Sequence, residues 1–157
     1  MSVNSKSVQG RRQLRFFSLH EVVLDAEQLV AARNAKTLGN WPVDQLLTHL
    51  AIAINSSIDG IPEKVHWIVR LVGSFLKGWV FKRGMSPGFR LPKQLEALAF
   101  PAGSSPEEAL HKLRAAVERV EREKMNARHP VFGKLTHEEW NQFHLRHAEL
   151  HLSFVIP

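Results

Sequence analysis

The feature that most constrains this chain is a series of helix start signals, each followed by an amphipathic stretch. Ser18 and Glu21 have the spacing of a capping box, in which a hydroxyl and a carboxylate satisfy free backbone N–H groups at the start of a helix. Thr136 and Glu139 repeat that spacing near the C-terminus. Residues 105–108 (Ser-Pro-Glu-Glu) combine an N-cap, a proline at the first helical position and two acidic residues. Behind each signal, apolar residues recur with the helical period, so the pattern predicts helices that pack through apolar faces.

Five helices are expected, and no stretch alternates with period two over a length that would build a sheet. The expected helices cover residues 18–38, 42–58, 62–81, 105–126 and 136–154. The predicted fold class is all-α: a four-helix bundle with an accessory helix and a long loop inserted between helices two and three. The accessory helix is residues 62–81. The loop, residues 82–104, is rich in Gly and Pro and carries apolar residues, which is typical of a lid or a binding loop. Residues 1–12 are expected to form a flexible N-terminal tail, and residues 13–157 a single helical-bundle domain.

The composition excludes several kinds of chemistry. The chain of 157 residues contains no cysteine and no tyrosine. Disulfides, thiolate metal ligands, cysteine nucleophiles and tyrosine acids or bases are therefore ruled out. Histidine and carboxylate side chains remain as the good metal ligands.

Charge and hydropathy bear on the partners and on the location of the protein. The formal net charge of +6 would suit an acidic partner, but the basic residues are scattered and form no recognised binding motif, so we expect no nucleic-acid partner. Charged residues interrupt the apolar stretch 62–81, so no membrane partner is expected; the alternative is an interfacial helix anchored by Trp67 and Trp79. The twin arginines at 11–12 precede charged residues instead of the apolar run of a signal peptide, and a cytoplasmic location is expected.

The last expected helix carries two histidines four residues apart. At about 100° per residue, His147 and His151 share a face with Trp140, and this face should point into the protein. Arg146 and Glu149 fall on the opposite side and are expected to face solvent. Two imidazoles one helical turn apart can bind one metal ion. The alternative is that both are core or rim histidines hydrogen-bonded to neighbouring groups.

A third histidine completes a candidate metal site. His49 lies at the edge of the apolar face of the second expected helix, where a histidine would line a cleft between helices, although a lone histidine at such a position is more often a surface or rim residue. Together with His147 and His151 it would give three imidazole ligands and one open coordination position, as in a catalytic site. The spacing does not distinguish zinc from nickel. His144, one turn before His147, is an alternative ligand or a support for one of the three.

Short motifs are spread over almost the whole chain from Leu14 onward. They are Leu38-Gly39-Asn40-Trp41, His49-Leu50, Phe132-Gly133, Trp140 and Arg146-His147-Ala148-Glu149-Leu150-His151-Leu152. In their order and spacing they resemble the DinB/YfiT-like superfamily of metalloenzymes, and within it a branch of unknown function. The resemblance implies a DinB-like four-helix bundle in which His49, His147 and His151 hold a divalent metal ion. Characterised relatives include thiol-dependent transferases and isomerases that use bacillithiol, mycothiol or glutathione, with the metal lowering the pKa of the thiol. The insertion 62–104 lies outside the minimal bundle, so the resemblance implies no particular substrate.

These features together predict a divalent-metal-dependent enzyme. Its cofactors would be zinc or nickel and a low-molecular-weight thiol, and its reaction the transfer of that thiol to small electrophiles. One alternative is a metal-dependent hydrolase in which the ion activates water. Another is a non-catalytic module that binds a metal or a small molecule. The expected partners are a small-molecule substrate and a second copy of the chain in a homodimer.

Overall fold

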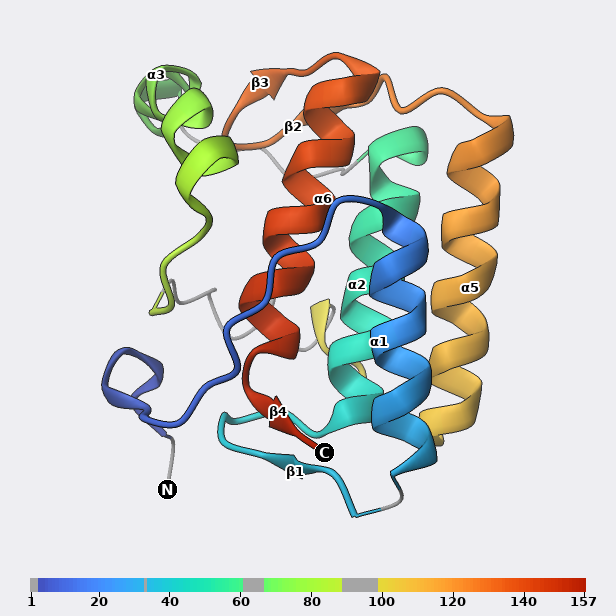
Figure 1. Cartoon of the computed structure of the whole chain (residues 1–157). Coiled ribbons are helices and arrows are strands. Elements are labelled where there is room, and N and C mark those ends of the chain that lie inside the picture. The colour runs from blue at the N-terminus through green and yellow to red at the C-terminus, as the bar shows by residue number, and fades with distance from the viewer. Residues whose placement is uncertain (1–2, 33, 61–66, 89–98) are drawn as a thin grey trace.

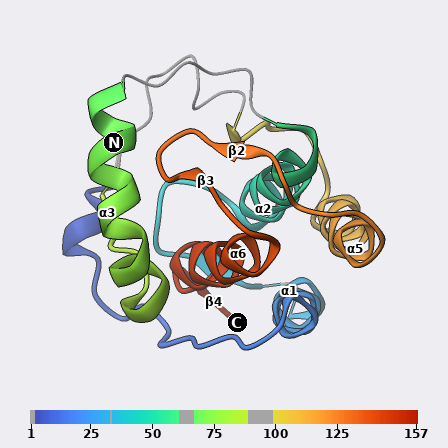
Figure 2. The same cartoon turned by 90° about the horizontal axis from the view of Figure 1, so that it is seen from above.

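Four long helices pack side by side, and a fifth lies against one of them (Figure 1). The computed structural model describes residues 3–32, 34–60, 67–88 and 99–157. The four helices are α1 (Leu19–Ala31), α2 (Val43–Asp59), α5 (Pro106–Arg122) and α6 (His137–Leu152). Helix α2 packs on α5 and α6, and α1 packs on the same two helices. Figure 2 looks along these four helices and shows α3 (Trp67–Arg83) running across that direction beside α6.

The mainly helical class expected from the sequence is confirmed, and the helix starts follow the capping signals. The hydroxyl of Ser18 accepts a hydrogen bond from the backbone N–H of Glu21 at 3.2 Å. Ser105 and Thr136 each form a complete capping box with the glutamate three residues further on. Because a cap depends only on residues within one turn, it can be identified in the sequence without knowledge of the tertiary structure.

Two short antiparallel ladders were not expected. Strand β1 (Lys36–Thr37) pairs with β4 (Val155–Ile156), and β2 (Arg128–His129) pairs with β3 (Gly133–Lys134). The first helix therefore ends at Ala31, well before the predicted end at residue 38, and α6 ends two residues earlier than predicted. The β1–β4 pairing joins segments from opposite ends of the sequence, so no local pattern indicates it.

Residues 11–17, here called the N-terminal strap, cross the side of α6 before α1 begins (Figure 1). The backbone N–H of Arg12 donates to the carbonyl oxygen of Ser153 at 2.9 Å. The guanidinium of Arg12 also binds both carboxylate oxygens of Asp25 at 2.7 Å, a bidentate arrangement that fixes the strap to α1. The division into a flexible tail at 1–12 and a domain at 13–157 stays a prediction.

The strap buries the side of α6 that was expected to face solvent. Arg146 and Glu149 are only 4% and 9% exposed, so their prediction as outward-facing residues is wrong. The backbone N–H of Phe16 donates to Glu149 Oε1 at 2.7 Å, and Arg146 Nη2 donates to the carbonyl oxygen of Phe16 at 2.7 Å. Arg146 and Glu149 also form an ion pair at 3.0 Å. The prediction assumes that this helix has one buried face, whereas two of its faces are buried in the structure.

The accessory helix α3 makes a close contact at one point and is exposed elsewhere. A Cβ atom at Gly73 would come within 2.7 Å of Val131 Cγ1, so the approach of α3 to the turn between β2 and β3 requires glycine. Further along the helix, Phe75 is 80% exposed, and Leu76 and Trp79 are also exposed. Among the described residues, no helix has the length and apolar character needed to cross a membrane.

Candidate metal centre

The packing of α2 against α6 brings the three predicted histidines together. His49 comes from the second turn of α2, and His147 and His151 lie on successive turns of α6. Nε2 of His147 is 3.1 Å from Nε2 of His49 and 3.0 Å from Nε2 of His151. The three candidate ligand atoms all lie within 4.8 Å of one another. The three residues are only partly buried by their accessible area.

Hydrogen bonding among the three rings does not satisfy all of their nitrogens. Nδ1 of His49 lies 2.9 Å from the carbonyl oxygen of Ala99, which only accepts, so Nδ1 carries the proton and Nε2 of the neutral ring carries a lone pair. Nε2 of His147 faces a nitrogen on each side, and Nδ1 of the same ring is buried with no hydrogen-bond partner among the residues that the structure describes. In the tautomers of His147 and His151 that carry the proton on Nδ1, all three Nε2 atoms offer lone pairs that a divalent cation would satisfy. Bonds of ~2.0–2.1 Å in a tetrahedral arrangement hold two nitrogens roughly 3.3 Å apart, close to the 3.1 Å and 3.0 Å separations of His147 from the other two ligands.

Burial keeps the three rings neutral, the form in which imidazole binds metal. Burial lowers the pKa of His49 to about 4, against a partly opposing hydrogen bond to Ala99. Burial also lowers the pKa values of His147 and His151 well below 6.5, and the neighbouring histidines of the cluster lower them further. At neutral pH no proton has to leave these rings before a cation binds.

Aromatic rings surround the triad. The ring of His49 stacks on Phe100 with centroids 4.0 Å apart, and Phe100 stacks in turn on Trp41 at 3.9 Å with the planes only 3° apart. His147 stacks on Phe143 at 5.3 Å. No sequence signal identified Ala99 and Phe100 as part of this site, because they lie far from His49 in the chain and outside any periodic pattern.

His144 does not belong to the group of three ligand atoms. It is buried against Trp140, with ring centroids 5.4 Å apart, and neither ring nitrogen has a hydrogen-bond partner within the described residues. Burial, together with the nearby His129, lowers its pKa to about 3. Burial likewise lowers the pKa of His129 to about 4. Both are therefore neutral core histidines at physiological pH.

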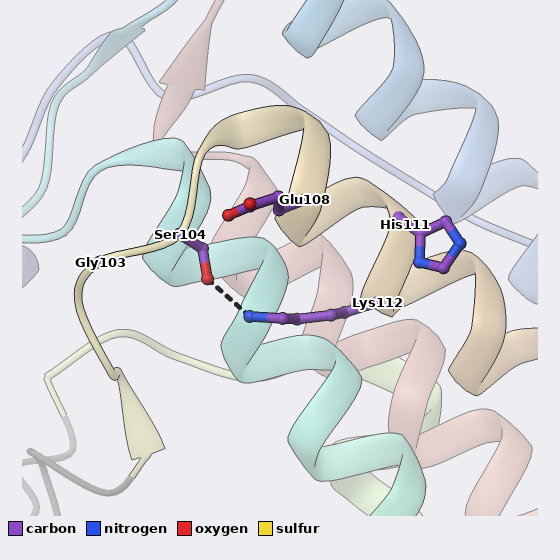
Figure 3. Close-up of a pocket in the computed structure, with 5 residues that line it drawn as sticks. All are labelled: Gly103, Ser104, Glu108, His111 and Lys112. Carbon is purple, nitrogen blue, oxygen red and sulfur yellow. Dashed lines mark hydrogen bonds between the residues drawn. The ribbon is translucent and has the colours of Figure 1, made fainter.

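A separate hollow of about 470 Å³ opens at the start of α5 (Figure 3). Its lining residues are Gly103, Ser104, Glu108, His111 and Lys112. Lys112 Nζ donates to Ser104 Oγ at 2.6 Å, and the Glu108, His111 and Lys112 side chains are exposed. The hollow is a surface depression and does not include any residue of the histidine triad.

Comparison with known proteins corrects the resemblance drawn from the short motifs. No curated protein and no solved structure matches the chain. One family model matches residues 8–157, and its description is "Protein of unknown function (DUF1569)", not the DinB/YfiT-like superfamily. The motifs that suggested DinB/YfiT are short, and a helical bundle with paired histidines can satisfy them without membership of that superfamily. Since the match covers nearly the whole chain, the protein belongs to the DUF1569 family of proteins of unknown function.

Proposed function

We propose that this protein binds one divalent transition-metal ion through His49, His147 and His151 and uses it in an enzymatic reaction. The observation that supports this proposal is the convergence of three neutral imidazole nitrogens from two helices, with no fourth histidine or carboxylate joining the group in the described part of the chain. Structural zinc sites are closed by four protein ligands, whereas catalytic sites leave one position for substrate or water. A small molecule would have to reach that position, and none of the three histidines belongs to the fully buried class.

The proposed reaction is the transfer of a low-molecular-weight thiol to a small electrophile. A bound ion would supply Lewis-acid chemistry, lowering the pKa of a coordinated thiol or water. The chain has no cysteine, so the thiol must come from a separate molecule. The thiol would lose its proton, its sulfur would form the new bond to carbon, and the leaving group would depart with its electron pair. Hydrolysis, with water in place of the thiol, is the alternative reaction at the same centre.

The first test measures metal content by elemental mass spectrometry on untagged protein after incubation with zinc or nickel and removal of the excess. The wild type should carry about one equivalent per chain, and His49→Ala and His151→Ala should lose it, because a site with two imidazoles binds far more weakly. His111→Ala, a histidine exposed on α5, is the matched control and should keep the metal. A wild type that holds no zinc or nickel would overturn the proposal and favour a metal-free binding module.

The second test separates the two reactions. Loaded protein is incubated with small electrophiles and with simple esters and amides, in the presence and absence of glutathione, mycothiol or bacillithiol. Conversion that requires the thiol and yields a thioether would support transfer. Cleavage of an ester or amide without any thiol would exclude it in favour of the hydrolase. The homodimer, the cytoplasmic location and the absence of nucleic-acid and membrane partners remain predictions of the sequence.

A further inference from the structure

Of the three proposed ligands, His49 has the least support from its own helix. His147 and His151 are neighbours on α6, so the helix itself sets their spacing. His49 is the single ligand from α2, and its ring must be held in one rotamer and one tautomer for Nε2 to meet the other two. Free rotation of this ring would leave a two-ligand site.

Two contacts from the chain just before α5 hold the ring of His49. The carbonyl oxygen of Ala99 accepts from Nδ1–H at 2.9 Å, which fixes the tautomer and leaves the Nε2 lone pair free. Phe100 covers one face of the ring at 4.0 Å and 17° between planes, which fixes the ring plane. Within the described residues, Nδ1 of His49 has a hydrogen-bond partner, whereas Nδ1 of His147 has none.

Phe100 is itself held in place. It is 7% exposed, and its second face lies on Trp41, just before α2, at 3.9 Å. The rings of Trp41, Phe100 and His49 thus form one stack. This stack connects the segment before α5 with the residues just before α2 and with the second turn of α2. Phe100 also lies 5.7 Å from the ring of His151, so it limits the access of water to two of the ligands.

We propose that Phe100, together with the backbone carbonyl of Ala99, is the positioning element of this metal centre and presets His49 for metal binding. This inference rests on the proposed metal-binding function. Groups that orient metal ligands in this way change metal affinity by roughly 10- to 100-fold when removed.

The main experiment measures the zinc affinity of the full-length protein by competition with a chromophoric chelator. Phe100→Leu keeps an apolar side chain but removes the ring, and should weaken zinc binding roughly 10- to 100-fold. Phe100→Trp restores a stacking ring and should bind zinc within a few-fold of wild type. Phe81→Leu is the matched control: Phe81 is equally buried at 7% and contacts the ring of Phe132, and it should leave zinc affinity unchanged.

Two further readouts separate positioning from simple packing. Cobalt substituted for zinc should give an altered visible absorption band in Phe100→Leu but not in Phe81→Leu, because only the first changes the ligand geometry. Long-range proton–nitrogen correlation spectra of the metal-free wild type should show His49 protonated at Nδ1, assigned by the loss of its signals in His49→Gln. This second readout needs no Phe100 variant, so it stands even where Phe100→Leu does not fold.

The outcomes distinguish this inference from the function on which it rests. A wild type that does not bind zinc overturns both. A wild type that binds zinc, together with a folded Phe100→Leu of unchanged affinity and unchanged cobalt spectrum, overturns the positioning role and leaves the metal site standing. His49 protonated at Nε2 in the metal-free protein also overturns it, because the contact with Ala99 would then be absent in solution.

Discussion

Acidification from pH 7 to pH 5 should strongly destabilise the metal-free protein, because its buried histidines bind protons in this pH range in the unfolded chain but scarcely in the folded one. Burial lowers the pKa of His49 and His129 to about 4 and that of His144 to about 3. In the unfolded chain the same rings titrate near 6.5. Below that pH the unfolded state binds more protons than the folded state, so the free energy of unfolding falls as the pH falls.

The size of the effect follows from these pKa values. At pH 5 each of the three histidines takes up a proton in the unfolded chain but not in the folded one, which lowers the free energy of unfolding by roughly 2 kcal/mol per ring. The sum of about 6 kcal/mol is comparable with the whole stability of a domain of this size, about 5–15 kcal/mol. Burial raises the pKa of Glu149, so this carboxyl opposes part of the change.

Comparing the wild type with a His144→Leu variant isolates the contribution of His144 to this pH-dependent loss of stability. Urea unfolding at pH 7, 6 and 5, with a chelator present, would be followed for the wild type and for His144→Leu. The wild type should lose roughly 2 kcal/mol more than the variant between pH 7 and pH 5, since only the wild type carries the His144 proton uptake. His111→Leu, at an exposed position on α5, should follow the wild type. An identical pH dependence in the wild type and His144→Leu would refute the reasoning.

Two other substitutions test packing that the sequence did not indicate. Glu149→Ala should lower the free energy of unfolding by about 3 kcal/mol or more in urea titrations, because it leaves the guanidinium of Arg146 buried without the carboxylate of its ion pair. A loss of less than about 1 kcal/mol would mean that water reaches this ion pair. Gly73→Ala should lower the free energy of unfolding by about 1–3 kcal/mol, because the added Cβ clashes with Val131. Gly78→Ala on the same helix, where a Cβ meets nothing within 4 Å, should leave the stability unchanged or raise it. Equal changes in stability for the two variants would contradict the close approach of α3 to Val131.

The capped helix starts and the end of α2 at Asp59 could be predicted from the sequence, whereas the end of α1 could not. Ser18, Ser105 and Thr136 act on backbone groups within their own first turn, so the signal and its effect lie together in the chain. The end of α1 at Ala31 depends on the pairing of β1 with β4, which requires the last residues of the chain. The assignment to the DinB/YfiT-like superfamily is wrong because it rests on short motifs, which carry little information on their own.

The candidate site was predictable to the extent that helix geometry determines it. The four-residue spacing of His147 and His151 defines a pair on one face, and an apolar arc places His49 near the facing helix. Arg146 and Glu149 were assigned to the wrong environment because the helical wheel assumes a single buried face. The N-terminal strap that covers the second face is far from α6 in the sequence, so the periodic pattern within α6 cannot predict that contact.

The distribution of the triad along the chain has a consequence for biosynthesis. His49 and His147 are separated by 98 residues, and both ligands of α6 follow His49 in the order of synthesis. A nascent chain on the ribosome therefore cannot assemble the three-nitrogen site until α6 has been synthesised as well. Three-ligand metal binding must therefore follow the synthesis of α6, when β4 can also pair with β1. The cell's supply of free or chaperoned metal at that stage, and not earlier in translation, would then determine which ion the protein carries.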